Sequence, residues 1–178
     1  MTSKNNNADK WEYVRHHWHL IDGKVYSLAY GHQIAFSSIN TNGRGNCIAH
    51  YNGKGLAIQE HQAVWMLQHK QAIPDNFVIH HQDLDYTNNA PENLILLSKR
   101  AHQFYHRYIK GAKGYRYDPV TSQVKPWFAR VSLPIGRVIA CRCETEEGAR
   151  NFVSKHQLPM LKALKAKGCL LLEDIAIN

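Results

Sequence analysis

The chain has 178 residues, which is enough for one ordinary domain or two small ones with a buried core. Its formal net charge of +8 and pI near 9.4 favour a polyanionic partner, and a basic protein without such a partner is the alternative. There is no apolar run of about 18 residues or more, and residues 1–10 lack an apolar signal core. We therefore expect a cytoplasmic protein with neither a membrane span nor an export signal.

The spacing of the four cysteines also favours a cytoplasmic protein. They form neither a CxxC pair nor a dense framework, so neither a zinc ribbon nor a disulfide scaffold is indicated. Cys141 and Cys143 are two residues apart, which most simply places both side chains on one face of a strand. We expect all four to be reduced thiols.

Residues 1–19 divide into a tail and an aromatic segment. Residues 1–10 are polar and rich in asparagine, with nothing to bury, so we expect a loose tail. Residues 11–19 alternate aromatic side chains with His and Arg. This pattern predicts a strand or short helix that packs its tryptophans on the core, and phosphate contact by its histidines is the alternative.

Residues 20–58 consist of short apolar runs separated by turn signals. Three Asx-Gly pairs suit turns that need positive φ, so we expect a small antiparallel meander. The pairs are Asp22-Gly23, Asn42-Gly43 and Asn52-Gly53. The turns also carry basic side chains, which either face a DNA backbone or are solvated: Lys24, Arg44 and Lys54. Residues 60–71 then have the apolar stripe of a helix that ends before Pro74.

Histidines gather in residues 78–106. His80 and His81 end an apolar run, a loop rich in Asp and Asn follows, and Asn93 comes twelve residues after His81. A helical segment then carries His102 and His106, whose spacing of four places them on one helix face. Two strands that bring the His pair to this helix would place four imidazoles near one point, which predicts a metal site with a spare base.

This stretch resembles the HNH, or ββα-metal, nuclease family. The resemblance rests on the His80-His81 pair, the run from Asn88 to Leu94, and His102 at twenty-one residues after His81. It implies an HNH nuclease domain, here residues 20–108, that hydrolyses phosphodiester bonds in double-stranded DNA. It also implies one divalent metal ion per chain.

The family pattern implies a role for each matching residue. His81 takes the place of the general base, and Asn93 that of the residue that fixes the loop and helps to orient the base. His80, His102 and His106 would bind the metal, and for His106 phosphate contact or a surface position is the alternative. Many family members have Asp or Asn where this chain has His80 and His102. Three imidazoles favour zinc, nickel or manganese over magnesium.

The pattern also bears on four further residues of this region. His61, at the start of the predicted helix, is expected to be structural. Arg100 lies just before the metal-binding part of the helical segment, where it would grip the DNA backbone. Asp83 and Asp85 either support a ligating histidine or turn the loop through Asx bonds.

The pattern changes after His106. Residues 111–114 read as a linker, and strands are expected at 115–118, 127–133 and 138–143. Thr145 should cap a helix whose first turn is acidic. The last stretch, residues 158–178, reads as a short amphipathic helix and an apolar run that either packs on the third strand or forms a dimer contact.

Residues 109–178 resemble the plant ethylene-response-factor, or APETALA-type, DNA-binding domain. The matching pieces are residues 113–117, 127–131 and 145–149. In that family the sheet enters the major groove, so the resemblance implies that arginines of the sheet contact DNA, with solvated surface as the alternative. The arginines are Arg116, Arg130, Arg137 and Arg142.

The predicted protein is α+β. It has a small antiparallel meander, a ββα-metal nuclease core and a module of three strands plus a helix. The implied function is that of a metal-dependent, site-specific DNA endonuclease of the phage homing type, acting in a bacterial host cell. The alternatives are a non-specific degradative or defence nuclease and a DNA-binding regulator that no longer cuts. A homodimer is left open.

Overall fold

The computed structural model describes residues 6–40, 43–133 and 137–169. The chain divides into two compact units, Met1–Ser98 and Lys99–Asn178. The sequence predicted a nuclease domain that ends at residue 108. The division falls earlier, so the helix that follows the histidine-bearing hairpin is grouped with the second unit.

The first unit opens on helix α1, Asn7–His17, and this corrects the expectation of a loose tail for residues 7–10. Asn7 is buried, and its side-chain Nδ2 donates to the carbonyl of Ile73 at 2.9 Å. Val14 packs in the core of the unit. A long-range hydrogen bond therefore anchors a polar segment that has little apolar surface of its own. Residues 1–5 lie outside the described residues.

Five short strands follow, and they form two antiparallel sheets where the sequence predicted one meander. The first sheet pairs β1 with β2, and the second has the order β3-β4-β5. The strands are β1 (Trp18–Ile21), β2 (Lys24–Ser27), β3 (Ser38–Ile39), β4 (Gly45–Tyr51) and β5 (Lys54–Gln59). The turns at Asp22-Gly23 and Asn52-Gly53 have positive φ throughout, as predicted. Of the third pair, Asn42 lies outside the described residues.

Helix α2, Glu60–His69, forms the centre of this unit and confirms the predicted helix. Its apolar residues Ala63, Val64, Trp65 and Met66 are all buried in one hydrophobic cluster with residues of α1, the strands and the hairpin that follows. The helix ends at Lys70, which adopts the left-handed conformation.

The histidine-rich stretch forms an antiparallel hairpin. Strand β6, Phe77–His81, pairs with β7, Leu94–Ser98, so that His80 lies opposite Ile95 and His81 opposite Leu94. The loop between them ends in a short 3₁₀ helix, η1, Pro91–Asn93. Helix α3, Lys99–Ile109, follows β7 directly. The order of two strands and a helix is the one that the sequence predicted.

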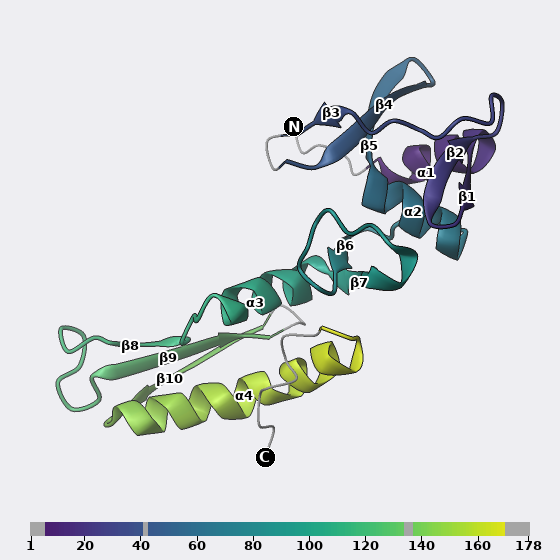
Figure 1. Ribbon diagram of the computed structural model, residues 1–178. Coiled ribbons are helices and arrows are strands. Elements are labelled where there is room, and N and C mark those ends of the chain that lie inside the picture. The colour runs from purple at the N-terminus through teal and green to yellow at the C-terminus, as the bar shows by residue number, and fades with distance from the viewer. Residues whose placement is uncertain (1–5, 41–42, 134–136, 170–178) are drawn as a thin grey trace. The chain divides into compact units, whose positions relative to one another are not determined.

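The second unit has a three-stranded antiparallel sheet of order β10-β9-β8. Its strands are β8 (Tyr115–Tyr117), β9 (Trp127–Ser132) and β10 (Val138–Cys143). Helix α4, Glu146–Ala166, lies along one face of this sheet (Figure 1). The small core between them contains Ala129, Val131, Ala149 and Val153. Thr145 caps α4 as predicted, because its hydroxyl accepts from the Gly148 amide at 3.1 Å.

Helix α4 is longer than predicted. It continues through Pro159 to Ala166, where the sequence suggested a separate short helix. The turn at 134–136 and the apolar run at 170–178 lie outside the described residues. None of the helices in the described part of the chain combines the length and the apolar composition that are needed to cross a bilayer.

Candidate active site

His80 and His81 are the last two residues of β6, and both are 3% exposed. Successive side chains of a strand point to opposite faces, so two adjacent histidines meet different surroundings. This separation allows one imidazole to bind a metal while its neighbour stays available for another role. The division of work between His80 and His81 stays a prediction, and the hairpin leaves room for it.

A chain of hydrogen bonds holds the ring of His81. His81 Nε2 lies 3.0 Å from Asn89 Oδ1, and Asn89 Nδ2 donates to Glu60 Oε2 at 2.9 Å. Because the amide nitrogen of Asn89 faces Glu60, its oxygen faces His81, and an amide oxygen can only accept. Nε2 of a neutral His81 must therefore carry the hydrogen, which leaves the lone pair on Nδ1. The hydrogen bonds that link Glu60, Asn89 and His81 therefore fix the tautomer of His81.

The surroundings of His81 keep it neutral. Burial lowers the pKa of its imidazole, and the positive charge of Arg44 lowers it further. The hydrogen bond that Nε2 donates to Asn89 raises this pKa by more than Arg44 lowers it, and the charges of Asp83 and Asp85 also raise it, but burial is the largest effect. A neutral imidazole is the form that accepts a proton, so His81 has the state of a general base near neutral pH.

Arg44 and His61 lie beside this base. Arg44 Nη1 donates to His61 Nε2 at 3.3 Å, and the ring centroids of His61 and His81 are 5.2 Å apart. Burial, followed by the charges of Arg44, His81 and Lys10, lowers the pKa of His61 to about 3. A neutral, buried acceptor agrees with the structural role predicted for His61. Arg44, expected in a turn, is half-buried beside the site.

The neutral state of His61 predicts a pH dependence of stability. Between pH 3 and 6.5 the unfolded chain binds a proton at this residue that the folded chain does not. The free energy of unfolding should therefore rise with pH across this window, by at most about 1.4 kcal/mol per pH unit from this group. Urea unfolding of the wild type and of His61→Gln at several pH values checks this: the difference between them should grow as the pH rises. Parallel curves would contradict it.

Asn93 fixes the loop rather than touching the base. Its Nδ2 donates to Asp83 Oδ1 at 2.9 Å and to the Asn88 carbonyl at 2.8 Å, and its Oδ1 accepts from the Asp83 amide at 3.1 Å. Asp83 and Asp85 also accept from backbone amides two residues further on. These are Asx bonds that turn the loop, the second of the two roles considered for the aspartates.

Sequence reasoning missed Asn89 and Glu60. Asn89 belongs to the run that carries the family resemblance, yet its spacing gives no sign that it contacts His81 instead of Asn93. Glu60 lies on α2, twenty-nine residues before its partner. No local pattern in the sequence links these residues.

His102 and His106 face each other on α3. Their Nε2 atoms are 3.1 Å apart and their ring centroids 4.4 Å. Two imidazole nitrogens at this distance are satisfied by one shared proton or one shared ion. His80, at the end of β6, and the facing pair on α3 are the three imidazoles that the family pattern assigns to the metal. Imidazole nitrogens are good ligands for zinc, nickel and manganese, so this donor set fits a divalent metal ion.

The arginines predicted to contact DNA occupy different positions. Arg116 and Arg142 lie opposite Phe128 on the two neighbouring strands. Their guanidinium carbons are 5.1 Å and 5.4 Å, respectively, from the centroid of the Phe128 ring. Arg142 donates to Asp118 Oδ2 at 2.8 Å and to two loop carbonyls, whereas the Arg116 side chain is 69% exposed. Arg142 is thus engaged in bracing the loop between β8 and β9. The other three are exposed: Arg100, Arg130 and Arg137.

The region thus has a hairpin that holds a neutral, oriented imidazole, followed by a helix with paired imidazoles. Residues 59–104 match the family model of the HNH endonuclease. The matched range extends from the residue before α2 to the middle of α3, and so it includes Glu60, Asn89 and His102. The match covers about a quarter of the chain, and it confirms the enzyme class expected from the sequence, that of a DNA-cleaving hydrolase.

The other comparisons add little. No curated protein matches the chain. Among solved structures, the chain is similar to the HNH homing endonuclease I-HmuI, described for its DNA binding and cleavage. The two are 21% identical, with a TM-score of 0.43, and the likeness covers 71% of this chain and 72% of that one. A likeness this distant does not establish function, and the resemblance of residues 109–178 to the ethylene-response-factor domain stays a prediction.

Proposed function

We propose that the protein is a metal-dependent, site-specific endonuclease that cuts double-stranded DNA, of the homing type that acts in a bacterial host cell. The observation that carries this proposal is the chain Glu60–Asn89–His81, which presents an oriented neutral base within the matched HNH module. A protein that only bound DNA would have no need for a base held in one tautomer.

In the proposed mechanism His81 Nδ1 takes a proton from the water that attacks the phosphorus atom. The ring gains positive charge as this happens, while Nε2–H keeps its hydrogen bond to Asn89. The Glu60 carboxylate, which holds Asn89 from the other side, stabilises that charge and fixes the ring plane. The role proposed for Asn93 is to keep the loop that carries Asn89 in shape.

His80, His102 and His106 would hold one divalent ion. A bound ion would polarise a phosphate oxygen and stabilise the leaving oxygen. The donor set favours zinc, manganese or nickel over magnesium, which prefers oxygen ligands.

Cations near the base would hold the cleaved strand. Arg44 is half-buried, and the neutral His61 is its hydrogen-bond acceptor, so its charge is not neutralised by that contact. We assign Arg44 to the phosphate at the site of cleavage. Arg100, in the first turn of α3, would contact a neighbouring backbone phosphate.

Site preference is proposed to come from the sheet of the second unit. Arg116 is the best placed of its arginines to read a base, because it is exposed and its guanidinium is supported by Phe128. Against the alternative of a non-cutting regulator, the base, the ligand set and the middle asparagine are all present. One such site cuts one strand at a time, so a double-strand break requires a second copy or a second visit.

The test is the pattern of ends that the full-length protein makes on plasmid and on whole phage DNA. With zinc, manganese, nickel or magnesium supplied, we expect discrete fragments, and run-off sequencing should map their ends to one short sequence. A smear on both substrates would identify the degradative alternative. Binding to DNA without any cleavage, in all four metals, would identify the regulator.

A further inference from the structure

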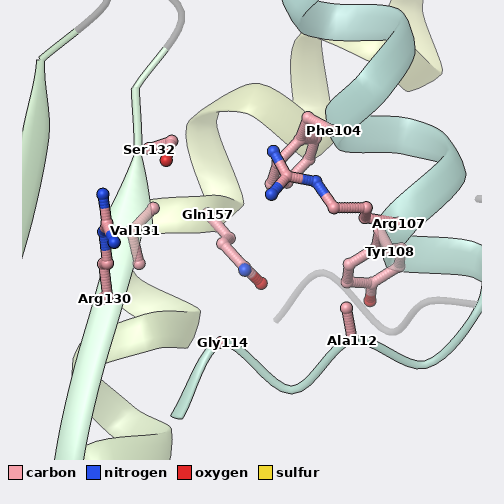
Figure 2. Close-up of a pocket in the computed structure, with 9 residues that line it drawn as sticks. All are labelled: Phe104, Arg107, Tyr108, Ala112, Gly114, Arg130, Val131, Ser132 and Gln157. Atoms are coloured by element: carbon pink, nitrogen blue, oxygen red, sulfur yellow. The ribbon is translucent and has the colours of Figure 1, made fainter.

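Three of the lysines and arginines that the structure describes are half-buried, and the others are exposed. The three are Lys10 of α1, Arg44 and Arg142. Charged side chains normally keep their ends in water, as Arg130 does: it is exposed, and Figure 2 shows its guanidinium directed away from Gln157. A half-buried cation therefore calls for a partner of opposite charge or for another explanation.

Only one of these three cations has a partner of opposite charge. Arg142 forms an ion pair with Asp118 at 2.8 Å. Within the described part of the chain, neither Lys10 nor Arg44 forms an ion pair. Lys10 Nζ donates instead to the uncharged side chain of Gln62, at 3.1 Å from its Oε1. Burial of a charge without a counter-charge opposes folding, so stability does not explain these two cations.

The helical spacing of α1 places Lys10 on the buried face of that helix. Asn7, Lys10 and Val14 are three and four residues apart, so they share one face, and α1 packs on α2 (Figure 1). Asn7 is held by the carbonyl of Ile73, and Val14 is fully buried. The bond to Gln62 thus holds the Lys10 ammonium at the first turn of α2, where the helix dipole makes a cation unfavourable.

Lys10 and Arg44 both lie near the ring of His61. Arg44 Nη1 donates to His61 Nε2 at 3.3 Å, and the charges of Arg44 and Lys10 both lower the pKa of His61. Gln62, the partner of Lys10, is the next residue of α2. The ring centroid of His61 is 5.2 Å from that of His81. Two positive charges without acidic partners are therefore gathered at the start of α2, beside the candidate base.

We propose that Lys10 is a further DNA-binding residue of the nuclease site, and that it contacts the backbone phosphate next to the one assigned to Arg44. A lysine ammonium is a compact point charge that suits a phosphate oxygen. Two cations around one ring, each with its own acceptor on α2, fit successive phosphates of one strand. A bound phosphate would supply the missing negative charge. The inference rests on the proposed function in one respect, that DNA is the partner.

The unfavourable position of Lys10 gives the proposal a signature that a structural lysine would lack. Lys10→Gln removes the charge and keeps a polar side chain that can still bond to Gln62. The midpoint of urea unfolding should stay the same or rise, because burial of the charge and repulsion by Arg44 no longer oppose folding. The affinity for DNA should fall in the same variant. A lysine kept for stability would give the reverse, a lower midpoint with unchanged DNA binding.

Four variants of the full-length protein test the proposal: Lys10→Gln, Lys10→Arg, Arg44→Gln and the double variant Lys10→Gln/Arg44→Gln. Lys70→Gln is the matched control, since Lys70 is an exposed lysine at the other end of α2. Binding to two duplexes of unrelated sequence is measured by fluorescence anisotropy over a range of salt concentrations, in EDTA so that the DNA stays uncut. Urea unfolding of each variant is measured in parallel.

Lys10→Gln should weaken binding to both duplexes by the same factor and lower the slope of log affinity against log salt by about 0.9, the value for one phosphate contact. The double variant should lower the slope by about twice that amount, because two phosphates are lost. Lys10→Arg keeps the charge and should keep the slope. Lys70→Gln should behave like the wild type.

Two results would overturn the proposal. Equal slopes for Lys10→Gln and Lys70→Gln would remove Lys10 from DNA binding. A double variant with the slope of Arg44→Gln alone would show that Lys10 has no phosphate of its own. Lack of DNA binding by the wild type is a different outcome, because it would overturn the proposed function itself.

Discussion

Replacing His81 by alanine is expected to slow DNA cleavage by about 10²–10⁴-fold, the usual cost of losing a general base. His81 has the features of such a base, because it is buried, its pKa is lowered, and Asn89 holds its Nε2 so that Nδ1 keeps the lone pair. The base has no obligatory contact with DNA before the reaction. The affinity for uncut DNA should therefore remain close to that of the wild type.

The measurement is single-turnover nicking of plasmid DNA at matched metal concentration, with DNA affinity measured in parallel. His50→Ala is the matched control, since His50 is an exposed histidine of β4 in the same unit. Asn89→Ala should lose a smaller part of the rate than His81→Ala, because the base is present but its ring is no longer held. Equal nicking by the wild type and His81→Ala would remove His81 from the mechanism.

The histidines could be placed from the sequence because their environment is local. A strand, a loop and a helix that follow one another brought His81 and His102 to the expected elements, and the spacing of four put His102 and His106 on one helix face. The strands of the second unit were also found, because turn signals bound each of them. These features depend on near neighbours in the chain.

Contacts between distant segments could not be predicted in this way. Asn7 donates to the carbonyl of Ile73, which is 66 residues away in the sequence, and Asn89 donates to Glu60, which is 29 residues away. Hydrophobic periodicity reports which face of an element is buried, and it does not report which polar group lies opposite. The contact between Asn89 and the base therefore needed the structure.

Tertiary packing accounts for the length of α4, which continues past a proline. A proline inside a helix removes one hydrogen bond and costs about 3 kcal/mol, yet α4 continues through Pro159 where a separate short helix was expected. Beyond the proline, Met160, Leu161 and Leu164 are buried. Burying side chains of this kind contributes about 1.5–3 kcal/mol each, so together they exceed the cost of the proline.

Loss of His102 is expected to remove both bound metal and activity. The metal site is proposed on His80, His102 and His106, of which the last two face each other on α3. Removing one of three ligands should weaken metal binding by more than the roughly 10–100-fold that loss of an outer-shell partner costs. The same change leaves the Glu60–Asn89–His81 chain in place, so the two parts of the site can be tested separately.

Isothermal titration of metal-free protein with zinc, manganese, nickel and magnesium measures this loss, and nicking assays with the same ions measure its consequence. EDTA should abolish nicking by the wild type, and one of the four ions should restore this activity. His106→Ala should be milder than His102→Ala, because water or a phosphate oxygen can take the vacated position, and His50→Ala should bind metal like the wild type. If a chelated, metal-free preparation kept full activity, the three imidazoles would have no catalytic metal to hold. The facing pair on α3 would then be explained by a shared proton, with Nε2 donating to Nε2 across 3.1 Å.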